Sequence, residues 1–142
     1  MNPLGELSVS PPLIIVADDD AAVRSSLKFS LEIEGFAVRT YAGGAELLND
    51  TEVAGAGCLV IDQNMPGMNG LELLTQLRAR AVVAPAILIT SHPSAALRER
   101  AAQAGVAIVE KPLLGTSLLD HIRDLSSHRQ PQQSQPNGKR PN

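Results

Sequence analysis

Short apolar runs alternate with longer amphipathic segments along most of this chain. The runs at 13–16, 58–61 and 86–90 are almost wholly apolar, which is typical of strands buried on both faces of a parallel sheet. Two further strands are predicted at 36–41, where apolar and polar residues alternate, and at 106–109. The pattern therefore predicts five strands.

Helical periodicity fills the segments that follow these strands. After the first strand, Val23, Leu27 and Leu31 share one side of a predicted helix that ends at Gly35, with Arg24 placed on the opposite side. Asn69 is a suitable N-cap for the third helix. The other helices are predicted around 45–49, 94–104 and 114–125. Strands linked by helices run parallel through right-handed crossovers, so the fold class is α/β, with helices on both faces of one sheet.

The chain has the length of one domain, 142 residues. Residues 1–11 form a polar, proline-containing lead-in that we expect to be flexible. Residues 12–127 carry the alternating pattern and form the predicted domain. Residues 128–142 are rich in Gln, Pro and Asn without periodicity, so we expect a disordered tail.

Composition narrows the class of protein. The net charge is −3 and the aromatic residues are few, which argues against a nucleic-acid surface. The single cysteine, Cys58, excludes a disulfide framework and fits a reducing cytosol; we interpret it as a buried structural residue. No segment approaches the ~20 apolar residues of a membrane span. We expect a cytoplasmic protein with no nucleic-acid or membrane partner.

Polar side chains with related chemistry follow four of the five predicted strands. Asp18 and Asp19 follow the first, Asp62 the third and Lys111 the fifth, and Thr90 ends the fourth. Functional residues of open α/β sheets lie beyond the carboxyl ends of the strands. If the first, third, fourth and fifth strands are neighbours, these groups converge.

The residue types point to phosphoryl transfer. Several carboxylates in one crevice repel each other unless a cation intervenes, and a few hard oxygen ligands suit Mg²⁺. Lys111 offers a positive charge to an anion and Thr90 a hydroxyl donor. The remaining carboxylate, Asp62, would then be the nucleophile that forms an aspartyl phosphate.

Each residue alone has a simpler explanation. Asp18, Asp19 and Asp20 could cap the first helix, and Asp20 is expected to do so in any case. Asp62 could belong to the turn before Met65–Pro66–Gly67, Thr90 could be a strand-end hydroxyl, and Lys111 a solvated surface lysine. The simple explanations become improbable only when the four strand ends are considered together.

Four segments in order carry a family resemblance: 15–24, 58–70 with its Asp-x-x-Met-Pro-x-x-x-Gly pattern, 87–91, and Glu110–Lys111–Pro112. Over about residues 12–127 the chain resembles response-regulator receiver domains, and most of all those of the nitrogen-fixation regulator subfamily. The resemblance implies a doubly wound, flavodoxin-like (βα)5 fold with sheet order 2-1-3-4-5. It also implies that Asp18, Asp19 and Asp62 hold Mg²⁺ together with the backbone carbonyl of Asn64.

The resemblance further implies a phospho-accepting switch, not an enzyme that acts on other substrates. Asp62 would take the phosphoryl group from a sensor histidine kinase, and Thr90 and Lys111 would contact the phosphate oxygens. In this family the Lys111–Pro112 peptide is cis, which is uncommon even before proline.

The chain departs from the family pattern at Ile108, where an aromatic residue is usual. We therefore expect altered output signalling with phosphoryl acceptance retained. The surface formed by the fourth helix, fifth strand and last helix is the family's usual output and dimer surface, so weak self-association enhanced by phosphorylation is expected there. With no second domain after residue 127, we expect a stand-alone receiver without a DNA-binding output domain and with an unidentified downstream partner.

Three alternatives compete with this interpretation. A flavin-binding protein of similar topology needs a loop rich in Gly, Ser and Thr where this chain has three aspartates. A haloacid-dehalogenase-type phosphatase needs Thr or Val two residues after Asp20, where Ala22 stands. A degenerate receiver that binds partners without phosphorylation is favoured by Ile108 and opposed by the intact acidic pair, Asp62, Thr90 and Lys111.

Overall fold

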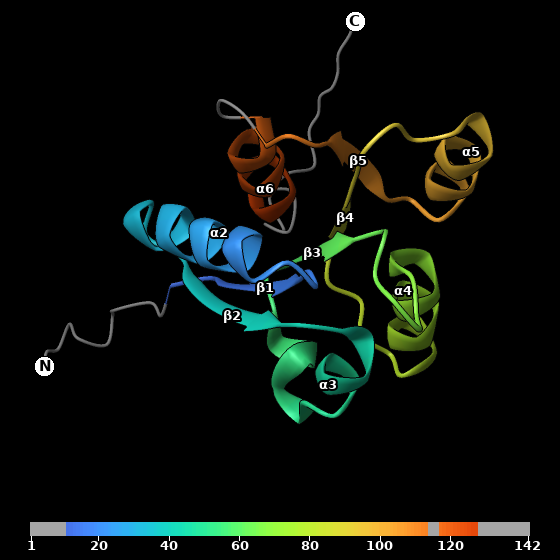
Figure 1. Cartoon of the computed structure of the whole chain (residues 1–142). Coiled ribbons are helices and arrows are strands. Elements are labelled where there is room, and N and C mark those ends of the chain that lie inside the picture. Colours follow the sequence, from blue (N-terminus) through green and yellow to red (C-terminus); the bar gives the residue numbers. More distant parts are fainter. Residues whose placement is uncertain (1–10, 114–116, 128–142) are drawn as a thin grey trace, which may run out of the picture.

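One parallel sheet organises the chain. The computed structural model describes residues 11–113 and 117–127, and in them five strands pair in parallel in the order β2-β1-β3-β4-β5 (Figure 1). This order confirms the predicted fold class. The strands are β1 (Leu13–Ala17), β2 (Ala37–Tyr41), β3 (Cys58–Asp62), β4 (Ala86–Thr90) and β5 (Ala107–Glu110).

Helices cover both faces of the sheet, as right-handed parallel crossovers require. One face carries α2 and α6, and the other carries α3, α4 and α5 (Figure 1). A short 3-10 helix, η1 (Thr51–Gly55), follows α3. The α-helices are α2 (Ala21–Ile33), α3 (Gly44–Leu48), α4 (Gly70–Ala79), α5 (Ala95–Gln103) and α6 (Ser117–Ser127).

The core lies in two layers because successive strand residues point to opposite faces. Ile14 and Val16 pack toward α2 and α6, whereas Ile15 and Ala17 pack toward α3, α4 and α5. Every residue of β3 and β4 is buried, including Cys58, as predicted. The central strands are therefore rigid supports for the residues at their carboxyl ends.

Side-chain caps set where the helices begin. Asp20 accepts hydrogen bonds from the backbone N–H groups of Ala22 and Val23 and so caps α2, as predicted. Asn69 caps α4 in a reciprocal capping box with Glu72. Both caps stand directly after the loops that follow β1 and β3, so they fix the entry of those loops into helices.

The predicted boundaries agree with the structure within a few residues, except that η1 was not predicted. The strand expected at 106–109 begins and ends one residue later, at Ala107 and Glu110. The lead-in, apart from Pro11, the start expected for the last helix at Leu114 and the tail at 128–142 lie outside the described residues. Among the residues described, no helix has the length and apolar character needed to cross a bilayer.

Candidate functional site

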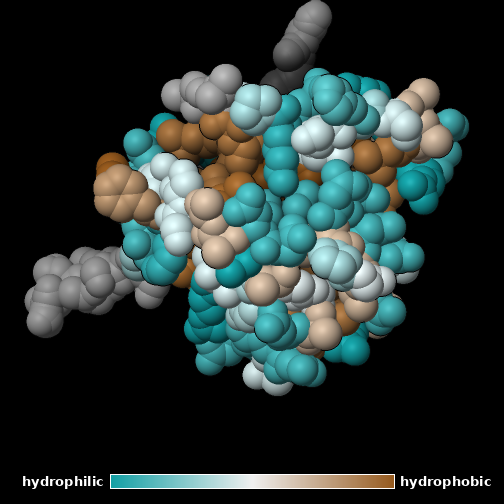
Figure 2. Space-filling view, in the orientation of Figure 1, coloured by the Kyte–Doolittle hydropathy of each residue, from teal (hydrophilic) through white to brown (hydrophobic). Residues whose placement is uncertain are grey.

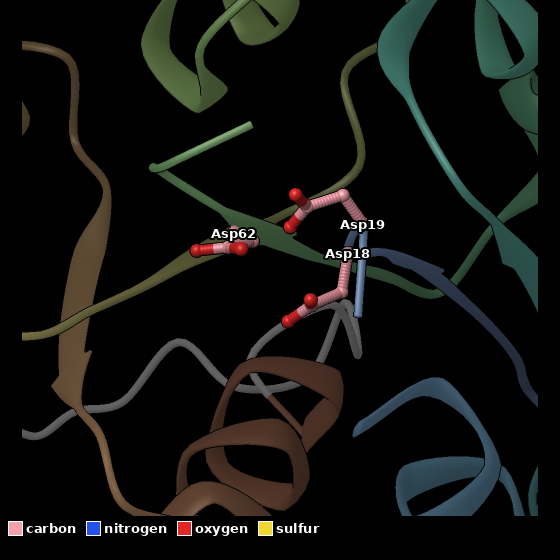
Figure 3. A group of neighbouring side chains, drawn as sticks. All are labelled: Asp18, Asp19 and Asp62. Carbon is pink, nitrogen blue, oxygen red and sulfur yellow. The ribbon is translucent and has the colours of Figure 1, made fainter. Parts of the chain in front are cut away.

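Three aspartates meet at the carboxyl edge of the sheet. Asp18 and Asp19 directly follow β1, and Asp62 is the last residue of the neighbouring strand β3. One carboxylate oxygen from each lies within 4.8 Å of the others, and the side chains point toward a common space (Figure 3). Asp18 and Asp62 are 0% and 1% exposed, while Asp19 is exposed. Burial of two carboxylates this close makes their mutual repulsion strong.

Three of the four polar atoms of Asp18 form hydrogen bonds. Its N–H donates to the carbonyl of Tyr41 at 3.1 Å, and its Oδ1 accepts from the N–H of Asp20 at 2.9 Å. Its carbonyl accepts from a guanidinium N–H of Arg24 at 2.7 Å. The buried Oδ2 accepts no hydrogen bond from the described residues.

Asn64 links Asp62 to Thr90. The Asn64 backbone N–H donates to Asp62 Oδ1 at 3.1 Å, and its side-chain Nδ2 donates to Thr90 Oγ1 at 3.3 Å. The Thr90 hydroxyl in turn donates to the carbonyl of Ser91 at 3.3 Å. Thr90 ends β4 beside β3 and is 2% exposed, so strand pairing brings its hydroxyl to the aspartates.

Lys111 completes the cluster from the end of β5. Its Nζ lies 3.5 Å from Asp18 Oδ2 and 3.4 Å from Asp62 Oδ2, and its backbone N–H donates to the carbonyl of Thr90 at 2.9 Å. The Lys111–Pro112 peptide is cis, as expected. Burial alone lowers the pKa of the lysine, but the charges of Asp62 and Asp18 outweigh it and raise that pKa.

The surroundings of Asp62 disfavour its ionised form. Burial is the largest cause that raises its pKa, and the charge of Asp18 adds to it. The Asn64 N–H and the Lys111 ammonium act in the opposite direction without cancelling the rise. A further positive charge at the aspartates would favour the ionised carboxylate.

The donor set fits a small divalent cation. Hard carboxylate oxygens are the ligands that Mg²⁺ takes from proteins, and the oxygens of Asp18, Asp19 and Asp62 approach closely enough to share one ion. The buried Asp18 Oδ2, which lacks a hydrogen bond from the described residues, is an acceptor that such an ion would satisfy.

The loop after Asp62 is tied to the start of α4. The Gln63 carbonyl accepts from the Gly70 N–H at 3.1 Å, and its side-chain Oε1 accepts from the Leu71 N–H at 2.9 Å. A Cβ at Gly70 would lie 2.8 Å from the Asp62 carbonyl oxygen. Only glycine therefore allows α4 to begin this close to the end of β3.

A groove between α2 and α6 runs up to this site. Lys111 and Asp20 line it at the end near the aspartates, and brown apolar side chains show in the hollow between the two helices (Figure 2). Its apolar lining includes Leu27, Leu31, Val109, Leu118 and Leu119.

The structure brings the predicted site residues together and adds Arg24, whose position differs from the predicted one. Arg24 was assigned to the side of its helix away from the core, but it is half-buried and bonded to Asp18. Its spacing carried the signal, because Arg24 stands three and seven residues before the buried Leu27 and Leu31 and so shares their helix face.

Comparison with known proteins agrees with this geometry. The response regulator receiver domain family matches residues 14–123, so the chain belongs to that family. The C4-dicarboxylate transport transcriptional regulatory protein DctR of Rhodobacter capsulatus is 39% identical over 108 residues, which cover 74% of this chain and 55% of DctR. The transcriptional regulatory protein FixJ of Azorhizobium caulinodans is 39% identical over 109 residues, covering 76% of this chain and 52% of FixJ.

A solved structure shows the same fold. The crystal structure of FixJ-N superimposes with a TM-score of 0.73 at 32% identity, covering 84% of this chain and 97% of FixJ-N. Membership of the receiver family is thereby confirmed, and the flavin protein and the phosphatase are set aside. The chain spans about half the length of the curated relatives named here, 55% and 52%. The expectation of a stand-alone receiver stays a prediction.

Proposed function

We propose that this domain accepts a phosphoryl group on Asp62 from a sensor histidine kinase, with Mg²⁺ held by Asp18, Asp19, Asp62 and the backbone carbonyl of Asn64. The observation that carries the proposal is the position of the Lys111 ammonium, 3.5 and 3.4 Å from the carboxylates of Asp18 and Asp62. Receiver domains as a family bind Mg²⁺ in an acidic pocket and work with such kinases.

The reaction moves one phosphoryl group between two side chains. A carboxylate oxygen of Asp62 attacks phosphorus, an O–P bond forms, and the N–P bond of the donor phosphohistidine breaks. The histidine nitrogen leaves with the electron pair of that bond and takes up a proton from solvent. Bound Mg²⁺ would supply positive charge that neutralises the phosphoryl oxygens.

The other residues of the site stabilise the negative charge of the transferred group. The Lys111 ammonium, already held between two carboxylates, is placed to pair with a phosphoryl oxygen. The Thr90 hydroxyl, now directed to the Ser91 carbonyl, is placed to donate to another. Neither residue exchanges a proton with the phosphoryl group in this scheme.

The proposed output surface is formed by α5, β5 and α6, where we expect partner binding and phosphorylation-enhanced dimerisation. On it, Arg98 of α5 lies 3.5 Å from Glu110 of β5. Ile108 is only partly buried and packs against the core beneath α5. A branched aliphatic side chain cannot make the large ring rotation open to an aromatic one, so the output response is proposed to differ while phosphoryl acceptance is retained. The domain is proposed to span residues 12–127 and to act in the cytoplasm.

The direct test is phosphorylation by a small donor. The protein is incubated with Mg²⁺ and acetyl phosphate, and its intact mass is measured beside that of Asp62→Asn. We expect a gain of one phosphoryl group that requires Mg²⁺ and is absent in the variant. No gain in a protein shown to bind Mg²⁺ would contradict the proposal and favour a docking module that works without phosphorylation.

A further inference from the structure

Two backbone groups and the Arg24 side chain hold the backbone and Oδ1 of Asp18, and the Lys111 ammonium lies 3.5 Å from its Oδ2. The Tyr41 carbonyl and the Asp20 N–H are backbone groups, whereas the contact to the Asp18 carbonyl comes from the Arg24 guanidinium at 2.7 Å. Hydrogen bonds from a charged donor are stronger than neutral ones. Among the contacts described, Arg24 is thus the side chain that holds the Asp18 peptide, whereas Lys111 meets the Asp18 carboxylate.

The fold directs this arginine to the strand end. Helical side chains lean toward the helix N-terminus, so an arginine at the end of the first turn of α2 reaches back over the short loop that carries the aspartates. That turn is itself fixed, because the Arg24 N–H donates to the Asp20 carbonyl at 3.0 Å and Asp20 caps the helix. The guanidinium therefore connects a rigid helix to the end of β1.

We propose that Arg24 is a positioning residue for the cation site, which it serves by fixing the Asp18 peptide so that Oδ2 faces Asp62 and Lys111. The inference rests on the proposed function. Groups that hold metal ligands from outside the coordination sphere contribute strongly to metal affinity. The positive charge of Arg24 by itself repels a nearby cation. If Arg24 acted only through its charge, removal of the guanidinium would strengthen Mg²⁺ binding, whereas loss of a positioning role would weaken it.

The test is a Mg²⁺ titration of Arg24→Met, monitored by isothermal calorimetry. Methionine keeps an unbranched side chain but lacks the charged guanidinium. Loss of an outer-sphere contact is expected to weaken Mg²⁺ binding about ten-fold. The matched control is Lys28→Met, one turn further along α2, which removes the same charge from an exposed side chain. The control is expected to bind Mg²⁺ within about two-fold of the unsubstituted protein, since an exposed charge interacts weakly at this range.

Unchanged or tighter Mg²⁺ binding in Arg24→Met would overturn the proposal, and so would equal weakening in both variants. If Arg24→Met does not fold, Arg24→Lys serves in its place, because it keeps the charge but lacks the planar fork. It too is expected to weaken binding, and affinity equal to that of the unsubstituted protein would overturn the proposal.

A second measurement without metal separates this inference from the proposed function. Amide hydrogen exchange in the presence of a chelator is expected to be faster at Asp20 in Arg24→Met, because the Asp20 N–H is bonded to Asp18 Oδ1. Unchanged exchange would overturn the positioning role. If the unsubstituted protein binds no Mg²⁺, the Mg²⁺ site in the proposed function is wrong. The exchange result still decides whether Arg24 positions Asp18.

Discussion

Asn64 connects Asp62 and Thr90, two residues of the proposed phosphoryl-accepting site. Its backbone reaches Asp62 and its side chain reaches Thr90, which is 26 residues further along the chain. The Thr90 hydroxyl is thus an acceptor for Asn64 and a donor to Ser91. Both of its hydrogen-bonding functions are satisfied, so the hydroxyl has a defined resting position.

Replacing Asn64 by Ala tests this contact. A hydrogen bond of this kind contributes about 0.5–1.5 kcal/mol to stability, and the exposure of Asn64 places the expected loss at the lower end. In a Thr90→Val background the same substitution is expected to cost almost nothing. Urea unfolding of the two single variants and the double variant gives the interaction free energy. A value near zero would show that the contact does not stabilise the folded state.

At the scale of elements, the connection from β3 to α4 does most to place Asp62. The strand ends in Asp62, the proposed nucleophile, Gln63 binds the first turn of the helix through its side chain, and Asn69 caps that helix. The helix begins against the strand because Gly70 has no side chain. The connection is therefore a rigid support for Asp62, and it depends on the close approach of Gly70 to the end of β3.

Gly70→Ala is expected to destabilise the domain by about 1–3 kcal/mol, the usual cost of overpacking. The added Cβ would lie 2.8 Å from the Asp62 carbonyl oxygen, 2.9 Å from Leu88 Cδ2 and 3.0 Å from Gln63 Cα. Gly55→Ala is the control, since a Cβ there meets nothing within 4 Å. Thermal unfolding of both variants measures the difference; equal stability would mean that the backbone at Gly70 relaxes without cost.

Most elements could be predicted from sequence because their signals are local. The strands at Cys58 and Ala86 are continuous apolar runs, and a parallel sheet buries such runs completely. The 3-10 helix η1 was not predicted because Val53 is its only buried residue. It is stabilised by a residue remote in sequence, because Arg39 of β2 forms hydrogen bonds with Asp50 and Glu52.

The candidate site was predictable for a different reason. Topology sends the carboxyl ends of parallel strands to one edge, so Asp18, Asp62 and Lys111 could be expected to meet before any distance was known. The contacts that orient them could not, because they depend on side-chain reach. Arg24 donates to a carbonyl of the loop before its helix, and Asn64 reaches Thr90 at the end of the neighbouring strand. The spacing of Arg24 indicates which helix face it shares but not the carbonyl that it binds, and no spacing encodes the contact of Asn64.

At the scale of the whole molecule, the buried carboxylates of the site destabilise the folded state. Asp18 and Asp62 are buried side by side at the end of the central strands, and the raised pKa of Asp62 shows that its ionised form is disfavoured in the folded state. Lys111 offsets part of this cost from β5. The folding free energy of the domain is therefore linked both to protons and to any cation that binds the aspartates.

This linkage predicts how Asp62→Asn changes stability with pH in a chelating buffer. Below the ordinary carboxyl pKa of 3.8, Asp62 is protonated in both the folded and unfolded states and costs nothing. As the pH rises through its raised folded pKa, ionisation is easier in the unfolded state, so the unsubstituted protein loses stability that the variant keeps. The stability gained by Asp62→Asn is expected to grow with pH and then level off. Urea unfolding between pH 4 and about pH 8, the range in which carboxyl groups complete their titration, measures it.

Saturating Mg²⁺ should reverse the order of the two proteins. A ligand that binds only the folded state adds about 2.7 kcal/mol at one hundred times its dissociation constant, and the variant lacks one of the three carboxylates that would bind the ion. The unsubstituted protein is then expected to be the more stable one. A pH-independent difference in chelator would mean that Lys111 fully compensates the burial of Asp62. A difference that Mg²⁺ leaves unchanged would mean that the aspartates lower stability without holding the cation.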